Sequence, residues 1–285
     1  VVQDAPWVLN WVAEEFRKSP YSLRNDGDHL TIVDEVGRRE IWLSRANTVY
    51  APDMANSFEY YFSSVESELR DGISVVDFSV PREHKLVGFD DFPLVFPSLA
   101  EPHQTCSQYL DFAELKPGDV VIDLGGYSGT TAIEFSKAVG PEGLVIVAEP
   151  DPVNANACRE NFSRHATVND LENIVLEEAA VSDQAGTISF SAEGAMGASS
   201  VDIVGDYRGD VIEVAAVTLA DLIEKHAIDR LAFLKIDIEG AETGVIRTSE
   251  TVLRSLRPRV VIEPHIVGGE LNAAELTGLL EGYGY

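Results

Sequence analysis

A glycine-rich turn follows an apolar run near the middle of the chain and has the composition of a ligand-binding loop. The run leads into the segment Asp123-Leu124-Gly125-Gly126-Tyr127-Ser128-Gly129. Glycine allows positive φ and lets a ligand approach bare backbone, and a helix that starts here offers unpaired N–H groups. We therefore expect this turn to bind a flat, polar ligand. The residues expected to contact it are Asp123, Gly125, Gly126, Tyr127 and Gly129.

The spacing of these glycines does not fit a dinucleotide site. That fingerprint needs glycine at its first, third and sixth positions, and Leu124 occupies the place of the first. Asp123 would repel a pyrophosphate, whereas it would attract an ammonium group. The turn therefore favours S-adenosylmethionine, which carries an ammonium and a sulfonium and no phosphate.

An acidic residue, Glu149, ends the next apolar run of the chain. A carboxylate at the end of that strand can accept hydrogen bonds from both hydroxyls of a ribose. Taken together with the glycine turn, Glu149 predicts a nucleoside-binding site.

Ionisable residues also follow two later apolar runs. Asp237 and Glu239 follow the first, and Glu263 and His265 follow the second. Ligands of open α/β sheets bind outside the carboxyl ends of the strands, so Asp237 should face the cleft that holds the reacting groups. A hydroxyl group that accepts the methyl group of S-adenosylmethionine needs a base to take its proton. Asp237 and His265 are the first candidates for this base, and Glu239 and Glu263 are the second. Glu239 could instead favour the dipole of a following helix.

Two alternatives for this chemistry stay open. A carboxylate acceptor, as on a uronic acid, would need no base. Asp237, Glu263 and His265 could also hold a divalent cation that orients a sugar diol, although carboxylates at neighbouring strand ends more often bind water or cap helices. Our expectation names no metal.

From Asp119 onward, short β-branched runs alternate with longer amphipathic segments, which is typical of βαβ units on a parallel sheet. The expected strands are Val120–Leu124, Leu144–Glu149, Ile174–Glu178, Leu231–Ile236 and Val260–Glu263. The expected helices are Thr105–Leu115, Thr130–Val139, Val153–Ser163, Leu219–His226, Ala241–Leu256 and Asn272–Glu281. The segment Gly186–Tyr207 is expected to hold a short strand, Thr187–Ser191, and then a mobile loop that forms a lid or a substrate wall.

Residues 1–100 show a different pattern. Leu30–Val33 and Glu40–Leu43 flank a glycine-containing turn and predict a hairpin. We expect residues 1–100 to form an α+β cap or extension, and residues 101–285 to form the cofactor-binding domain. The boundary is expected near Pro97–Pro102, ahead of a helix.

Charge limits the choice of partners. Asp and Glu number 48 against 21 Lys and Arg among 285 residues, a formal net charge of −27. Such a field repels nucleic-acid phosphates and anionic membrane surfaces, so we expect a small-molecule acceptor instead. The acidic excess fits a salty cytoplasm or an ordinary acidic protein. No apolar stretch is long enough to span a membrane and Cys106 and Cys158 are too few for a disulfide framework, so we expect a cytoplasmic protein with buried, reduced thiols.

Several of these segments together resemble the FkbM-type S-adenosylmethionine-dependent methyltransferases. The specific part is Lys235-Ile236-Asp237-Ile238-Glu239-Gly240-Ala241-Glu242, since the glycine turn alone would fit any class I methyltransferase. The other matching segments are Asp123–Gly129, Val217-Thr218-Leu219, Arg257-Pro258 and Glu263-Pro264-His265. The resemblance covers residues 101–285. It implies a Rossmann-like fold and O-methylation of a hydroxyl or carboxyl on a sugar, glycolipid or secondary metabolite.

The resemblance also implies roles for individual residues. The turn from Asp123 to Gly129 would hold the cofactor, Glu149 its ribose, and Asp237 would lie near the methyl group. The segment after the third strand is similar to the adenine-side loop of the family, with Ala180 and Asp183 as expected contacts. The family sheet normally ends in an antiparallel hairpin, so a sequence that stops just after a helix is expected to be truncated.

Two other classes of function stay open. An NAD-dependent sugar oxidoreductase or epimerase on a similar fold would need glycine at position 124 and a Tyr-x-x-x-Lys pair. Tyr109, Tyr127 and Tyr207 have no lysine four positions later. A non-catalytic module would bind the cofactor without turnover.

Overall fold

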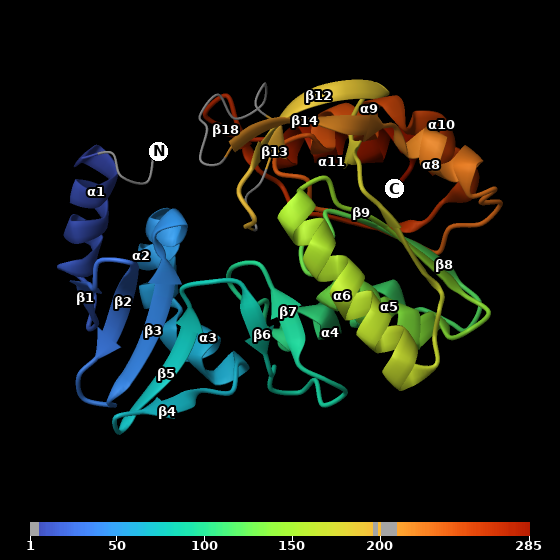
Figure 1. The fold of residues 1–285 in the computed structure, drawn as a ribbon. Coiled ribbons are helices and arrows are strands. Elements are labelled where there is room, and N and C mark those ends of the chain that lie inside the picture. The colour runs from blue at the N-terminus through green and yellow to red at the C-terminus, as the bar shows by residue number, and fades with distance from the viewer. Residues whose placement is uncertain (1–5, 196–198, 201–209) are drawn as a thin grey trace.

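A five-stranded parallel sheet forms the centre of the carboxyl-terminal part of the chain (Figure 1). The computed structural model describes residues 6–195, 199–200 and 210–285. The strands are β8 Val120–Leu124, β9 Leu144–Ala148, β10 Ile174–Glu177, β15 Phe233–Ile236 and β16 Arg259–Ile262. Their spatial order is β10-β9-β8-β15-β16, with every neighbouring pair parallel. The order reverses between β8 and β15, so the sheet is doubly wound, and the predicted Rossmann-like α/β fold is confirmed.

Helices pack on both faces of this sheet. Alternate residues of a strand point to opposite faces. Ile122 of β8 accordingly packs in a cluster with α8 to α11, whereas Val121 packs with α4 and α5. These helices and α6 are α4 His103–Ala113, α5 Thr130–Val139, α6 Pro152–Asn169, α8 Leu219–Lys225, α9 Glu242–Thr248, α10 Glu250–Leu256 and α11 Ala273–Tyr283.

The predicted single helix Ala241–Leu256 is in fact two helices. Ser249 separates α9 from α10, with φ −95° and ψ 9°, outside the helical region. Its N–H donates to the carbonyl oxygen of Ile246, three residues back, instead of continuing the four-residue pattern. Sequence periodicity did not show the break because the apolar spacing continues through it.

A second sheet lies between β10 and β15 in the sequence. Its strands are β11 Ala180–Val181, β12 Gly186–Ala192, β13 Ser199–Ser200 and β14 Asp210–Val217, in the order β11-β14-β12-β13. β12 and β14 pair antiparallel from Gly186 opposite Ala216 to Ala192 opposite Asp210. The sequence predicted only the strand Thr187–Ser191 of this sheet, within β12. The expected mobile loop falls largely on residues 196–198 and 201–207, outside the described residues.

The amino-terminal part contains a mixed sheet with helices beside it. The strands are β1 Ser22–Asn25, β2 His29–Asp34, β3 Arg39–Ser44, β4 Glu68–Arg70 and β5 Ile73–Phe78, in the order β1-β2-β3-β5-β4. The helices are α1 Pro6–Phe16, the 3-10 helix η2 Arg45–Tyr50, α2 Ala51–Asn56 and α3 Phe58–Ser64. The predicted hairpin is confirmed, since β2 and β3 pair antiparallel.

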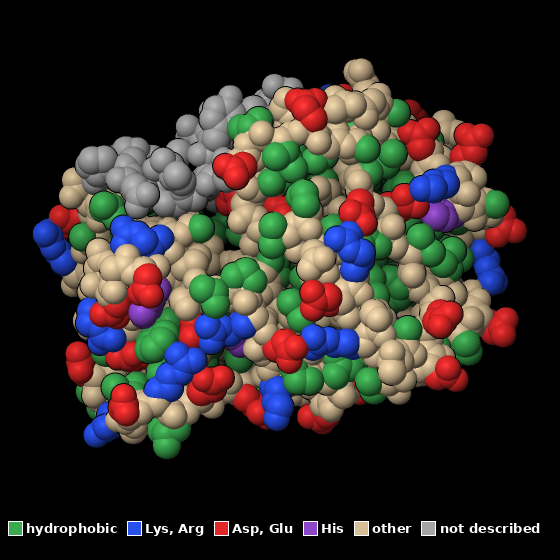
Figure 2. All heavy atoms as spheres, viewed as in Figure 1, with side chains coloured by type: hydrophobic (Ala, Val, Ile, Leu, Met, Phe, Trp, Pro, Cys, Tyr) green, Lys and Arg blue, Asp and Glu red, His purple; other side chains and the backbone are tan. Residues whose placement is uncertain are grey.

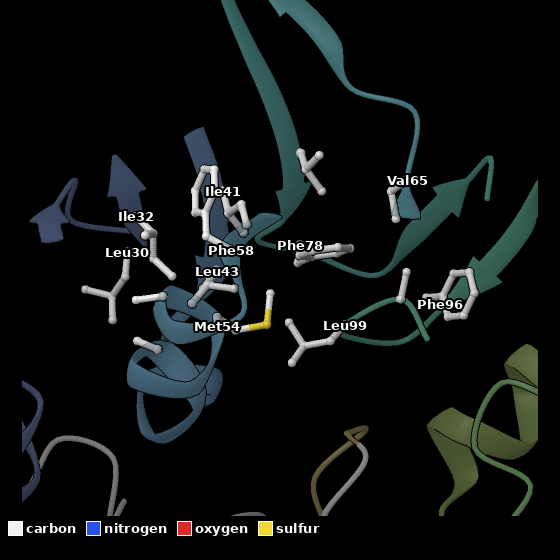
Figure 3. Packing of buried hydrophobic residues seen from close by; sticks show 14 of the residues in the cluster. Leu30, Ile32, Ile41, Leu43, Met54, Phe58, Val65, Phe78, Phe96 and Leu99 are labelled. Atoms are coloured by element: carbon white, nitrogen blue, oxygen red, sulfur yellow. The ribbon is translucent and has the colours of Figure 1, made fainter. Parts of the chain in front are cut away.

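The core of this amino-terminal sheet continues to the parallel sheet. Ile32, Leu43 and Phe58 pack in a cluster that runs on through Leu99 (Figure 3). The same cluster includes Tyr127, from the glycine turn. A division of the chain near residue 100 stays a prediction, but the two parts share buried side chains.

Asn161, near the middle of α6, binds the segment between β5 and α4 and so links it to the parallel sheet. This segment contains β6 Arg82–His84 and β7 Leu94–Phe96. The Asn161 side chain is fully buried, donates to the carbonyl oxygens of Val95 and Ser128, and accepts from the Val95 N–H. One side chain thus fixes β7 relative to the glycine turn.

The remaining features concern the surface and the cysteines. Acidic and basic side chains are interspersed on the face shown in Figure 2. Cys106 and Cys158 are free and buried, as expected. In the described part of the chain, no helix combines the length and the apolar character that a membrane crossing requires.

Candidate active site

A cavity opens at the carboxyl ends of the parallel strands. Its floor is formed by Gly125 after β8 and by Ala148 and Glu149 at the end of β9, while Ile188 and Phe190 of β12 line it from the second sheet. The other described residues that line it are Glu101, Tyr127, Pro150, Asn154, Ala180, Val181, Ser182, Ala195, Asp237, Ile238, Glu239, Ala241 and Glu263. The cavity therefore lies where ligands bind in doubly wound sheets.

The glycine turn packs tightly against its neighbours. Gly125 has φ 89°, and a Cβ there would lie 1.8 Å from the carbonyl oxygen of Asp237. A Cβ on Gly126 would lie 2.3 Å from Cγ1 of Val147, and one on Gly129 would lie 2.4 Å from the Phe162 ring. Gly125 lines the cavity, but the space that the three missing side chains leave is filled by protein. This differs from the expectation that a ligand fills it.

Glu149 lies at the floor of the cavity and is almost fully buried. Its Oε2 accepts from the Tyr127 N–H at 2.8 Å, and its Oε1 from the Asp151 N–H at 2.9 Å. Burial raises the pKa of Glu149 to about 8, although these N–H groups lower it. The carboxylate is held in place by the turn and keeps acceptor capacity for the hydroxyls of a ribose.

Asp123 has a different partner from the one expected. It is 1% exposed, does not line the cavity, and its Oδ1 lies 3.0 Å from Nζ of Lys235. Burial raises the pKa of Asp123, and Lys235 opposes that shift. Lys235 also donates to the Gly125 carbonyl oxygen at 3.1 Å and lies 3.8 Å from Asp237. This buried ion pair links β8 to β15 next to the turn. Asp123 therefore stabilises the site and does not line it.

Glu101 lines the cavity, and the sequence analysis did not single it out. It precedes α4 and accepts a hydrogen bond from Oγ of Ser128 at 3.3 Å. Burial raises the pKa of Glu101 to about 7, while Lys235 lowers it and Asp237 raises it. The only signal in the sequence was an acidic residue just ahead of a predicted helix, which is too common to indicate a site.

His265 is surrounded by carboxylates. Its Nδ1 lies 2.9 Å from Oε1 of Glu242, and its Nε2 lies 3.6 Å from Glu239 and 3.8 Å from Asp237. Burial alone would lower the pKa of His265, but Glu239 and Glu242 raise it to about 11. His265 is therefore an imidazolium near neutral pH and does not fit the role of general base.

Glu242, at the start of α9, contacts His265 and is held in place by hydrogen bonds. Its carboxylate is fully buried and accepts from the Gly240 N–H at 3.0 Å and from Nδ2 of Asn272 at 3.0 Å. Its position in the first turn of α9 also suits a negative charge. Atoms of Asp237, Glu239 and His265 lie within 4.8 Å of one another, a grouping that could hold a metal ion. A metal would have to displace the His265 proton.

Asp237, Glu239 and Glu263 remain candidates for a base beside the cavity. All three line it, and Asp237 and Glu263 do so from the ends of β15 and β16. Burial raises the pKa of Glu263, and the charge of Asp237 adds to the shift. A carboxylate with a raised pKa is a better proton acceptor than an ordinary one.

The two residues predicted for the adenine side lie apart. Ala180 lines the cavity, together with Val181 and Ser182. Asp183 lines an adjoining hollow beside Gly244 instead. Ala180 is thus at the cavity wall, and contact of this segment with adenine stays a prediction.

The sheet order, and a cavity built on the strand ends beside a glycine turn, define a class I methyltransferase fold. Comparison with known proteins specifies the family: a model described as the methyltransferase FkbM domain matches residues 123–285. The chain belongs to the FkbM methyltransferase family and is an S-adenosylmethionine-dependent methyltransferase. The resemblance inferred from the sequence is confirmed.

Parts of this chain are similar to individual proteins. The chain is 30% identical over 201 residues to 31-O-demethyl-FK506 methyltransferase FkbM of Streptomyces tacrolimicus, covering 60% of this chain and 74% of that protein. A segment is 34% identical over 86 residues to a protein-L-isoaspartate O-methyltransferase of Ignicoccus hospitalis, covering 29% of this chain and 40% of the relative. A solved methyltransferase FkbM structure from Methylobacillus flagellatus aligns with a TM-score of 0.38 and 15% identity, over 53% of this chain and 38% of that one.

Proposed function

We propose that this methyltransferase binds S-adenosylmethionine in the cavity and methylates a hydroxyl oxygen of an uncharged sugar, glycolipid or secondary metabolite. The observation that carries the proposal is the charge of the cavity wall. Five carboxylates line the cavity, and no Lys, Arg or His does so among its described lining residues. They are Glu101, Glu149, Asp237, Glu239 and Glu263. Such a wall suits a cationic donor and repels phosphates.

The lining residues fit the parts of this donor. Glu149 would accept hydrogen bonds from the ribose hydroxyls, because its carboxylate is fixed at the end of β9. Val181, Ile188 and Phe190 present an apolar surface to the adenine. The glycine turn would hold the rest of the donor against its backbone.

The donor supplies a methyl group made electrophilic by the sulfonium. The chain has to hold the acceptor oxygen in line with it and exclude water. As the oxygen–carbon bond forms and the carbon–sulfur bond of the donor breaks, leaving the neutral thioether, the hydroxyl proton would pass to Asp237 or Glu263, the carboxylates that line the cavity from the ends of β15 and β16. Protonated His265 orients the Asp237 and Glu239 side chains.

The same wall favours a hydroxyl over a carboxylate acceptor. A carboxylate would bring another negative charge toward Asp237, Glu239 and Glu263, which costs free energy in a partly buried site. A neutral hydroxyl adds no charge and can use one of these groups as base. The name of the FkbM relative specifies an oxygen acceptor, which supports O-methylation in general.

Calorimetry and product analysis test the proposal. Wild-type protein should bind S-adenosylmethionine and its demethylated product and should not bind NAD. Glu149→Gln should weaken donor binding by about tenfold or more, the scale of a hydrogen bond to a charged group, whereas exposed Glu114→Gln should not. Mass spectrometry of a panel of hydroxylated and carboxylated acceptors should find added methyl groups only on hydroxyls. Binding of NAD instead, or methyl ester products, would contradict the proposal.

A further inference from the structure

Glu101 faces the cavity from the segment that joins the amino-terminal part to α4. This segment is fixed to the glycine turn, because the Tyr127 hydroxyl donates to the carbonyl oxygen of Leu99 at 2.7 Å. Leu99 and Tyr127 belong to the same buried cluster. The position of Glu101 relative to the turn is therefore set by buried contacts, although it precedes the parallel sheet in the sequence.

Glu101 and Glu149 are held by neighbouring residues of one turn. The Ser128 hydroxyl donates to Glu101, and the Tyr127 N–H donates to Glu149. Both carboxylates line the cavity. A ligand whose ribose binds Glu149 can extend across the turn to Glu101.

Glu101 forms no salt bridge with a described residue, and in this it resembles Glu149 and differs from Asp123 and Asp237. Asp123 pairs with Lys235 at 3.0 Å. Asp237 lies 3.8 Å from both Lys235 and His265. The hydrogen-bond partner of Glu101 is the neutral Ser128 hydroxyl, and the positive charge of Lys235 acts on Glu101 without a salt bridge, which leaves Glu101 able to bind a cation directly.

We propose that Glu101 binds the α-ammonium group of S-adenosylmethionine, the role that the sequence analysis gave to Asp123. This inference rests on the proposed function, since it assumes that the donor occupies the cavity. The ammonium would give Glu101 a charge-assisted hydrogen bond, the strong kind in proteins. The segment that joins the amino-terminal part to α4 would then supply a residue to the cofactor site.

Binding of two adenosine ligands distinguishes an ammonium-binding role of Glu101 from a structural or catalytic one. S-adenosylhomocysteine carries the ammonium, whereas 5′-methylthioadenosine keeps the adenosine and the sulfur but lacks the amino-acid group. By calorimetry, Glu101→Gln should weaken S-adenosylhomocysteine binding by about tenfold or more, the scale of a hydrogen bond to a charged group. Its affinity for 5′-methylthioadenosine should stay that of the wild type, which also shows that the variant is folded. Glu114→Gln, at the end of α4 and bonded to Arg259, is the matched control.

The other outcomes overturn the inference. Equal loss for both ligands would mean that Glu101 supports the turn or the adenosine, and unchanged binding of both with a lower kcat would make it a base. Wild-type protein that binds neither ligand would refute the proposed function itself. Normal wild-type binding with an unaffected Glu101→Gln variant would refute only the role of Glu101.

Discussion

Nδ1 of His265 lies 2.9 Å from Oε1 of Glu242, a carboxylate that is fully buried at the start of α9. This contact aims the other ring nitrogen at Glu239 and Asp237. With these partners the pKa of His265 is raised to about 11, so the ring is a poor proton acceptor near neutral pH.

The charge of His265 makes stability depend on pH. With carboxylate partners its pKa is about 11, above the ordinary value of 6.5. A raised pKa means that its stabilisation is fully present below about pH 6.5 and is lost as pH rises toward 11. The difference in unfolding free energy between wild type and His265→Gln should therefore shrink with rising pH, by at most about 1.4 kcal/mol per unit. Urea unfolding of both proteins between about pH 6.5 and 9.5 measures this. A constant difference would show that the imidazole is neutral.

Removal of the base should lower the rate by a much larger factor than it weakens donor binding. Asp237→Asn and Glu263→Gln remove the two carboxylates at the ends of β15 and β16 that line the cavity. The variant that lacks the base should lose about 10²- to 10⁴-fold in kcat, the usual contribution of general base catalysis. Single-turnover rates with saturating S-adenosylmethionine test this, with calorimetry as the check on binding. Full activity in both variants would point to a base-free reaction.

Much of the fold follows from local pattern. The β-branched runs and amphipathic segments after Asp119 predicted the strands of the parallel sheet, because each strand and helix of a βαβ unit carries its own local apolar pattern. The chain order of these strands then brought Glu149 and Asp237 to one edge of the sheet. β14 was missed, although Val214 and Ala216 alternate with exposed residues there, because its pairing partner β12 precedes it across a long connection.

The parts of the site that could not be predicted depend on long-range contacts. Lys235 pairs with Asp123 from another strand, which removes Asp123 from the cavity wall. Glu101 reaches that wall only because Tyr127 binds the backbone of Leu99. Glu242 sets the charge of His265 across two elements. The sequence therefore predicts which residue types lie at the carboxyl ends of the strands. Which of them form pairs depends on packing between distant segments.

Gly125 should be required for stability rather than for ligand contact alone. A methyl group there would lie 1.8 Å from the Asp237 carbonyl oxygen, in a backbone with φ 89° that disfavours side chains. Gly125→Ala should lower the unfolding free energy by roughly 2 kcal/mol or more without any ligand present. Gly278 of α11 is the control, because a Cβ there meets nothing within 4 Å. Gly278→Ala should be neutral or stabilising by up to about 1 kcal/mol. Equal changes in the unfolding free energy of the two variants, measured by thermal unfolding, would contradict this explanation.

Metal removal should leave the reaction intact. The three groups that could hold an ion include His265, whose Nε2 carries a proton while its pKa is near 11. Activity and donor affinity after exhaustive dialysis against EDTA should match those of the untreated protein. Loss of activity that returns with Mg²⁺ would instead assign a cation to Asp237, Glu239 and His265.

Salt should stabilise the protein through its net charge. The formal charge of −27 makes the folded chain repel itself, and screening shortens that repulsion from about 10 Å at 0.1 M salt to about 3 Å at 1 M. Salt also weakens exposed ion pairs such as Arg254–Glu250, but these contribute about 0–1 kcal/mol each. The free energy of unfolding in urea should therefore rise from low salt to molar KCl. Sucrose at matched osmolality separates screening from general exclusion of solutes. Equal stabilisation by sucrose, or unchanged stability in KCl, would show that self-repulsion does not limit this fold.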